Sequence, residues 1–67
     1  MDEATRYGES EITDAFLEAQ HADFSRSQIE RMVADAKRNG QSRDFGDGYM
    51  IFCSGGIFTA CVNRKYI

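Results

Sequence analysis

The stretch YMIFCSGGIFTACVN, residues 49–63, decides the fold of this chain. Residues 49–54 and 57–63 are rich in β-branched and aromatic side chains, and Gly55-Gly56 between them forms a two-residue loop that favours a primed turn. We therefore predict an antiparallel hairpin. Its register pairs Cys53 with Phe58, Ile51 with Ala60, and Tyr49 with Val62. These six side chains share one face, which is apolar apart from the tyrosine hydroxyl.

The opposite face of the predicted hairpin is mixed in character. It carries Met50, Phe52, Ser54, Ile57, Thr59, Cys61 and Asn63. No segment is an obvious cover for Met50, Phe52 and Ile57, and an apolar patch of this kind on a small protein indicates a partner or a second copy of the chain. The alternative is that the N-terminal arm or residues 66–67 fold over the patch.

Upstream of the hairpin, residues 26–39 have the clearest local signal for a helix. Ser25 followed by Gln28 fits a capping box, and Phe24 with Ile29 occupies the positions of a hydrophobic staple. Gly40 supplies a left-handed residue that ends a helix. The predicted apolar stripe consists of Ile29, Met32, Val33 and Ala36.

A first helix is predicted from Ser10 to about residues 20–22, because apolar residues recur there every three or four positions. Residues 1–9 lack periodicity and are expected to form a mobile acidic arm. Residues 10–67 then form a single small α+β domain. Its two N-terminal helices pack on a C-terminal hairpin, which a short strand at residues 42–45 could extend to a three-stranded meander.

The charge of the chain is divided between its two parts. Residues 1–24 carry seven carboxylates and one Arg, whereas residues 25–67 carry seven Lys/Arg and four carboxylates, for a net charge of −3. Such asymmetry bears on partners rather than on fold. The first helix places Glu11, Asp14 and Glu18 on one face, with Glu9 before them, and this face could bind a basic partner. The alternative is a solubilising surface, partly neutralised by Arg26, Arg31 or Arg38.

The two cysteines allow one disulfide at most. In the predicted register Cys53 and Cys61 project to opposite faces, so we expect two free thiols. One histidine and two distant cysteines make no zinc site, and we expect no cofactor. No apolar run reaches the roughly 20 residues that span a bilayer. We expect a cytoplasmic protein without a membrane role.

A small RNA-cleaving toxin is an alternative function. It would combine His21, as a general acid or base, with Arg26, Arg31 or Arg43, and with Tyr49. Small RNA-cleaving toxins with helices packed on an antiparallel sheet use comparable residues, and the chain resembles that architecture from His21 through the hairpin. No complete catalytic set can be assembled from these residues, and we predict a protein that is not an enzyme.

Direct binding of nucleic acid is not expected, because the isoelectric point is about 4.9. Basic residues are nevertheless present on the second helix and at the end of the chain. Aromatic residues lie between them in the sequence, at Phe45, Tyr49, Phe52 and Phe58.

The chain also resembles the small acidic proteins that phages encode against host defence, including anti-CRISPR proteins. The resemblance rests on size, the absence of Pro and Trp, the acidic helix and the lone hairpin. It implies binding to a nucleic-acid-handling enzyme of the host, with carboxylates in place of phosphates. We therefore predict a protein-binding inhibitor or adaptor, and a homodimeric module is a further alternative. The predicted partner-binding residues are Glu9, Glu11, Asp14, Glu18, Met50, Phe52 and Ile57.

Overall fold

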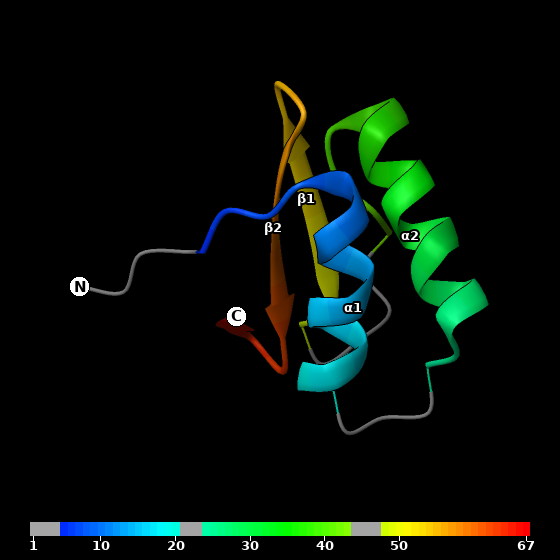
Figure 1. The fold of residues 1–67 in the computed structure, drawn as a ribbon, viewed down its shortest axis with the longest axis vertical. Coiled ribbons are helices and arrows are strands. Elements are labelled where there is room, and N and C mark those ends of the chain that lie inside the picture. Colours follow the sequence, from blue (N-terminus) through cyan, green and yellow to red (C-terminus); the bar gives the residue numbers. More distant parts are fainter. Residues whose placement is uncertain (1–4, 21–23, 44–47) are drawn as a thin grey trace.

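The computed structural model describes residues 5–20, 24–43 and 48–67. Two helices precede three strands along the chain (Figure 1). The elements are α1 (Glu9–Ala19), α2 (Arg26–Asn39), β1 (Met50–Ser54), β2 (Ile57–Val62) and β3 (Lys65–Tyr66). The predicted α+β class and the order of helices before strands are confirmed.

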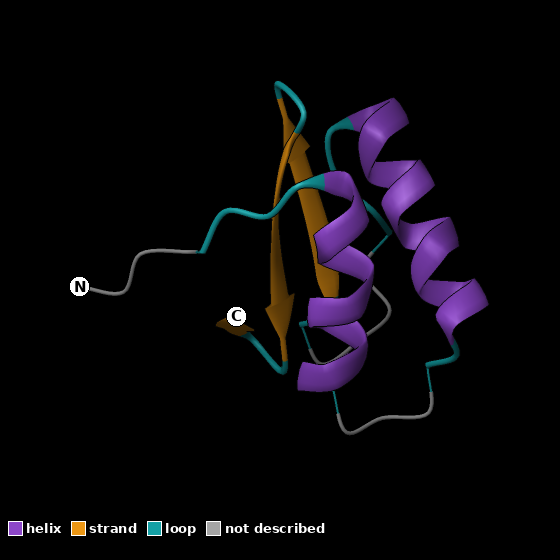
Figure 2. Ribbon diagram, viewed as in Figure 1, coloured by secondary structure: helices purple, strands orange, loops and turns teal. Residues whose placement is uncertain are grey.

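The molecule has one layer of helices and one layer of sheet. The strands form an antiparallel sheet in the order β1-β2-β3, and both helices lie on the same side of it (Figure 2). α1 packs against β2 and α2 packs against β1. The buried core between the layers consists of Ile12, Phe16, Ile29, Met32, Val33, Ala36, Ile51, Phe58, Ala60 and Val62.

The predicted hairpin register is confirmed at two pairs. Ile51 lies opposite Ala60 and Cys53 lies opposite Phe58. Gly55 and Gly56 have φ angles of 57° and 80°, as a primed two-residue turn requires. Tyr49 precedes β1, so its predicted pairing with Val62 is not part of the observed ladder.

The helix predicted at residues 26–39 has those bounds in the structure. The Gln28 backbone N–H donates to Ser25 Oγ at 3.2 Å, and the Ser25 N–H donates to Gln28 Oε1 at 2.8 Å. Gly40 ends the helix in the left-handed conformation, with φ of 88°. Because the capping partners are three residues apart, this helix is specified almost entirely by local sequence.

The third strand differs from the predicted one. β3 follows β2 through a tight turn at Asn63-Arg64, both of which have positive φ angles. The strand expected at residues 42–45 falls partly outside the described residues. Its neighbour Gln41 forms only a single bridge to Phe52, and the Ser42 N–H donates to the Ile51 carbonyl at 2.8 Å. A two-residue connection closes at low entropic cost, which favours the C-terminal strand.

The expected N-terminal arm is corrected at its C-terminal end, whereas residues 1–4 lie outside the described residues. Tyr7 forms an antiparallel bridge with Phe58 in β2, and α1 begins at Glu9. Further along the same edge of β2, the Ile67 N–H donates to the Ala60 carbonyl at 3.1 Å. The two ends of the described chain therefore share the outer edge of β2. At its other end α1 finishes at Ala19, slightly before the predicted limit.

Candidate functional site

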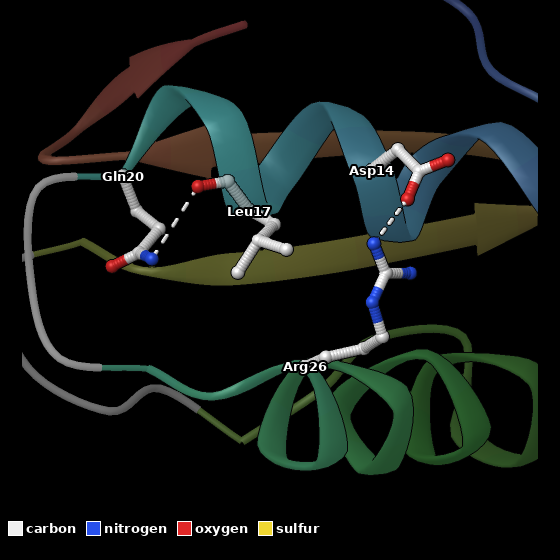
Figure 3. A network of polar contacts seen from close by, with 4 residues as sticks. All are labelled: Asp14, Leu17, Gln20 and Arg26. Carbon is white, nitrogen blue, oxygen red and sulfur yellow. Dashed lines mark hydrogen bonds and ion pairs between the residues drawn. The ribbon is translucent and has the colours of Figure 1, made fainter.

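Two of the predicted acidic residues on α1 form ion pairs with α2. Asp14 Oδ1 lies 2.7 Å from Arg26 Nη2 (Figure 3), and Glu9 Oε2 lies 2.9 Å from Lys37 Nζ. All four side chains are at least half exposed. Exposed pairs of this kind contribute only about 0.2–1 kcal/mol each. Two carboxylates of the predicted binding face are thus partly neutralised within the molecule; Arg26 was among the residues expected to do so, whereas Lys37 was not.

Glu11 and Glu18 are the other two predicted acidic residues, and both are exposed. Seven helical positions separate them, so they lie on one side of α1 and about 10 Å apart along its axis. Among the described residues, neither forms an ion pair. Glu11 also has a local role. It stands in the first turn of α1, where Gly8 provides no side-chain cap, and its negative charge is favourable at that helix terminus.

The helices are also joined at the end of α1. Gln20 Nε2 donates to the Leu17 carbonyl at 3.4 Å, as Figure 3 shows, and to the Phe24 carbonyl at 3.3 Å. Phe24 in turn makes edge-to-face contacts with Phe16 and Tyr49, with ring centroids 6.1 Å and 5.3 Å apart. The C-terminal end of the acidic helix is therefore held against the segment that leads into α2 and against Tyr49, which precedes β1.

A groove of about 660 Å³ lies between the two helices. It is lined by Glu9, Ser10, Thr13, Arg26, Glu30, Val33, Ala34 and Lys37. The charges in this groove are of both signs, and two of its residues, Glu9 and Lys37, are paired with each other. Its lining mixes four charged side chains with apolar ones such as Val33, and the groove is open to solvent, unlike the mostly apolar pockets that enclose small ligands.

The second predicted surface is the face of the sheet that the helices do not cover. Ile57 is 45% exposed, whereas Met50 and Phe52 are half-buried. Cross-strand pairing arranges this face in three rows: Ser54 with Ile57; Gln41, Phe52 and Thr59; and Met50, Cys61 and Tyr66. Tyr66 is 55% exposed and was not among the predicted site residues. Its place on this face depends on β3, which sequence reasoning did not find.

Arg6 also belongs to this open face. Tyr7 packs against the core from its bridge with Phe58, and side chains alternate along an extended segment, so Arg6 projects to the opposite side, next to Thr59. A hollow of about 460 Å³ lies there, lined by Arg6, Gly40, Phe52, Cys53, Ser54, Ile57 and Thr59. Arg6 was not a predicted site residue. The one sequence feature that bears on its position is that it directly precedes Tyr7, because neighbouring side chains of an extended segment point to opposite sides.

Two described arginines of the alternative nuclease site, Arg26 and Arg43, are not brought together. Arg26 and Arg43 flank opposite ends of α2, a helix of 14 residues that is about 21 Å long. Arg26 is paired with Asp14, and Tyr49 packs in the aromatic cluster with Phe16 and Phe24. His21 lies outside the described residues.

The two cysteines are free thiols on opposite faces of the hairpin, as predicted. Cys53 packs against the core, whereas Cys61 lies on the open face in the row with Met50 and Tyr66. Partial burial raises the pKa of the Cys61 thiol. Within the described ranges, no group of three or more His, Cys, Asp or Glu side chains is placed to hold a metal ion.

Comparisons with known proteins give no relative for this chain: no family pattern, no curated protein and no solved structure matches it. In the described part of the chain, neither helix has the length and apolar character needed to cross a membrane. The features that bear on function are therefore the acidic face of α1 and the face of the sheet that the helices do not cover.

Proposed function

We propose that this protein is a small protein-binding domain, an inhibitor or adaptor, that presents the acidic face of α1 to a basic surface of a partner protein. The observation that carries the proposal is the pair Glu11 and Glu18, two exposed carboxylates on one side of a helix without an ion pair among the described residues. Asp14 lies three positions after Glu11 and four before Glu18, and like charges at this spacing weaken an isolated helix slightly, so a binding role would account for the three carboxylates together.

Asp14 and Glu9 would contribute to the same face by exchanging partners. Their ion pairs with Arg26 and Lys37 are exposed and weak, so a partner's cations can replace the intramolecular ones at low cost. In line with the resemblance to phage anti-defence proteins, we propose that the partner handles nucleic acid. Its phosphate-binding Lys and Arg side chains would then contact these carboxylates.

The test is affinity capture from the native host with quantitative mass spectrometry, using Glu11→Gln/Glu18→Gln. This variant leaves both ion pairs intact, whereas a change at Asp14 would also release Arg26. The matched control is Ser27→Lys/Asn39→Lys, which shifts the net charge equally but at exposed positions of α2.

We expect the Glu11/Glu18 variant to lose a partner that the control retains. Binding of the purified partner should weaken steeply as salt is added, because exposed charges are screened beyond about 8–10 Å at physiological ionic strength. Equal capture by both variants would contradict the proposal.

A further inference from the structure

Asn39 and Gly40 form the junction between α2 and the segment that leads to the sheet. Asn39 is the last residue of α2, and Gly40 follows it in the left-handed conformation. Both residues are exposed, and a Cβ at Gly40 would meet nothing within 4 Å. Asn39 also lines a hollow of about 420 Å³ together with Asp35 and Arg43. Water therefore reaches the side-chain amide of Asn39, and no side chain shields the peptide bond that follows it.

An asparagine that precedes glycine can lose its side-chain amide in water. The backbone nitrogen of the glycine attacks Cγ of the asparagine, so that a new C–N bond forms. The amide nitrogen leaves as ammonia and takes the proton of the backbone N–H with it. Water then opens the cyclic imide at one of its two carbonyls, which gives aspartate or isoaspartate. Glycine favours the first step because it has no Cβ to obstruct the approach.

The end of α2 restrains this reaction in the folded state. The Gly40 N–H, which must lose its proton, donates to the Ala36 carbonyl at 2.8 Å. The Gly40 carbonyl accepts from the Cys53 N–H at 2.9 Å, so β1 holds the next peptide group as well. Attack on Asn39 therefore requires the last turn of the helix to open. Local opening at the end of a helix costs less free energy than unfolding of the core.

The same segment covers the outer edge of β1. Beyond Gly40, the Ser42 N–H donates to the Ile51 carbonyl at 2.8 Å, and the Ile51 N–H donates to Ser42 Oγ at 2.9 Å. With the bond from Cys53 to Gly40, these contacts satisfy three backbone groups of β1. A strand edge without such cover is a template for pairing with another chain. The integrity of the junction thus keeps this edge closed.

We infer that Asn39 is a deamidation site and that its isoaspartate product uncovers the outer edge of β1. Isoaspartate inserts one extra carbon atom into the main chain before Gly40. This insertion shifts Gly40 away from its place opposite Cys53, and Ser42 from its place opposite Ile51. The new carboxylate also stands at the C-terminal end of α2, where negative charge is unfavourable. The junction is separate from the acidic face of α1, so the inference does not depend on the function proposed above.

The first experiment compares the rate of deamidation in native and urea-unfolded protein at the same mildly alkaline pH. Peptide mapping by mass spectrometry distinguishes asparagine, aspartate and isoaspartate at position 39. We expect the native protein to react about two- to tenfold more slowly, which is the factor that one net hydrogen bond provides. Asn63 is the internal control, because the bulky Arg64 follows it, and it should react more slowly than Asn39 in the unfolded protein.

The second experiment follows hydrogen exchange at the Ile51 and Cys53 amides, which the junction protects. Both should exchange faster once Asn39 has become isoaspartate, whereas the Phe58 amide, which donates to Tyr7, should not change. Freshly purified Asn39→Asp is the matched control, since it adds the carboxylate without lengthening the main chain. Asn39→Gln should keep its protection after the same incubation.

Three results would overturn the inference. The absence of deamidation at Asn39 in unfolded protein would remove the site, and equal rates in native and unfolded protein would remove the restraint by α2. Unchanged exchange at Ile51 and Cys53 in the isoaspartate form would show that the edge of β1 stays covered. Equally fast exchange in Asn39→Asp would assign the effect to charge and would contradict the role of the longer main chain.

Discussion

Tyr7 and Phe58 exchange two backbone hydrogen bonds, each 2.8 Å long, across almost the whole sequence. This bridge attaches the segment before α1 to the outer edge of β2. It also directs the Tyr7 side chain to the core and Arg6 to the open face. The position of Arg6 on the open face thus depends on a backbone interaction between residues far apart in the sequence.

We expect Tyr7→Pro to lower the free energy of unfolding by more than about 0.5–1.5 kcal/mol, because proline has no N–H to donate to the Phe58 carbonyl and the variant also loses the ring that packs against the core. Urea denaturation measures the change. Thr5→Pro is the matched control, since Thr5 is exposed and lies outside the bridge. If both variants unfold at the same urea concentration, the bridge adds nothing to stability.

The capping box of α2 gives a second prediction. Ser25→Ala should cost about 0.5–2 kcal/mol of stability, because the Gln28 N–H loses its acceptor at the start of the helix. Ser27→Ala, at the exposed second position of the same helix, should change stability by less than about 0.5 kcal/mol. Chemical denaturation of the two variants compares them directly. Similar losses would mean that the cap is not the source of the effect.

Two glycines with positive φ angles should respond differently to alanine. A Cβ at Gly48 would lie 2.6 Å from the Arg64 backbone nitrogen, whereas a Cβ at Gly40 would meet nothing within 4 Å. Gly40→Ala should therefore cost only the left-handed conformation, about 1–2 kcal/mol. Gly48→Ala must also displace the turn between β2 and β3.

We expect Gly48→Ala to lower the thermal midpoint clearly more than Gly40→Ala does, and to shift the backbone amide signals of residues 62–66. Equal midpoints would show that the approach of Arg64 to Gly48 is unimportant.

The thiols give a prediction that depends on pH. Burial raises the pKa of Cys61, so the folded state favours the protonated thiol. This preference contributes to the free energy of unfolding below the pKa of the thiol in the unfolded chain. The contribution is lost as the pH rises through the pKa of Cys61 in the folded state. Native protein should therefore be alkylated at Cys61 more slowly than unfolded protein at the same mildly alkaline pH, because the thiolate is the reactive form.

Peptide mapping after timed alkylation measures that rate, and Cys61→Ala should reduce the decline in stability at high pH. Intact mass after alkylation of unfolded, unreduced protein should show both thiols modified. A mass lower by two protons before alkylation would instead reveal a disulfide.

The sequence alone did not show where the individual charges lie on the surface. The sequence shows an acidic first part, and an isoelectric point of about 4.9 argued against nucleic acid as a ligand. The isoelectric point reports the total charge only and does not show where the charges lie on the surface. In the fold, Arg26 pairs with Asp14 of α1, whereas Arg6 lies beside Thr59 on the open face of the sheet. Two of the aromatic residues thought to accompany the basic ones, Tyr49 and Phe58, pack on the core side.

The sequence by itself determined α2 and the hairpin. Their signals are local: Ser25 with Gln28, Gly40 after the last turn, and Gly55-Gly56 between two β-prone runs. The hairpin register also placed Cys53 and Cys61 on opposite faces, as observed. Such features can be read from a few neighbouring residues because the interacting groups are close in the chain.

Only the tertiary structure decided which segments complete the sheet and which charges remain free. Tyr7 and β3 occupy the outer edge of β2, although residues 42–45 had a comparable β pattern. A strand pattern indicates that a segment can pair but not which edge it pairs with. That choice depends on the cost of closing each loop and on the groups already bound at each edge. The exposed face that results, from Arg6 to Tyr66, exists only in the folded molecule.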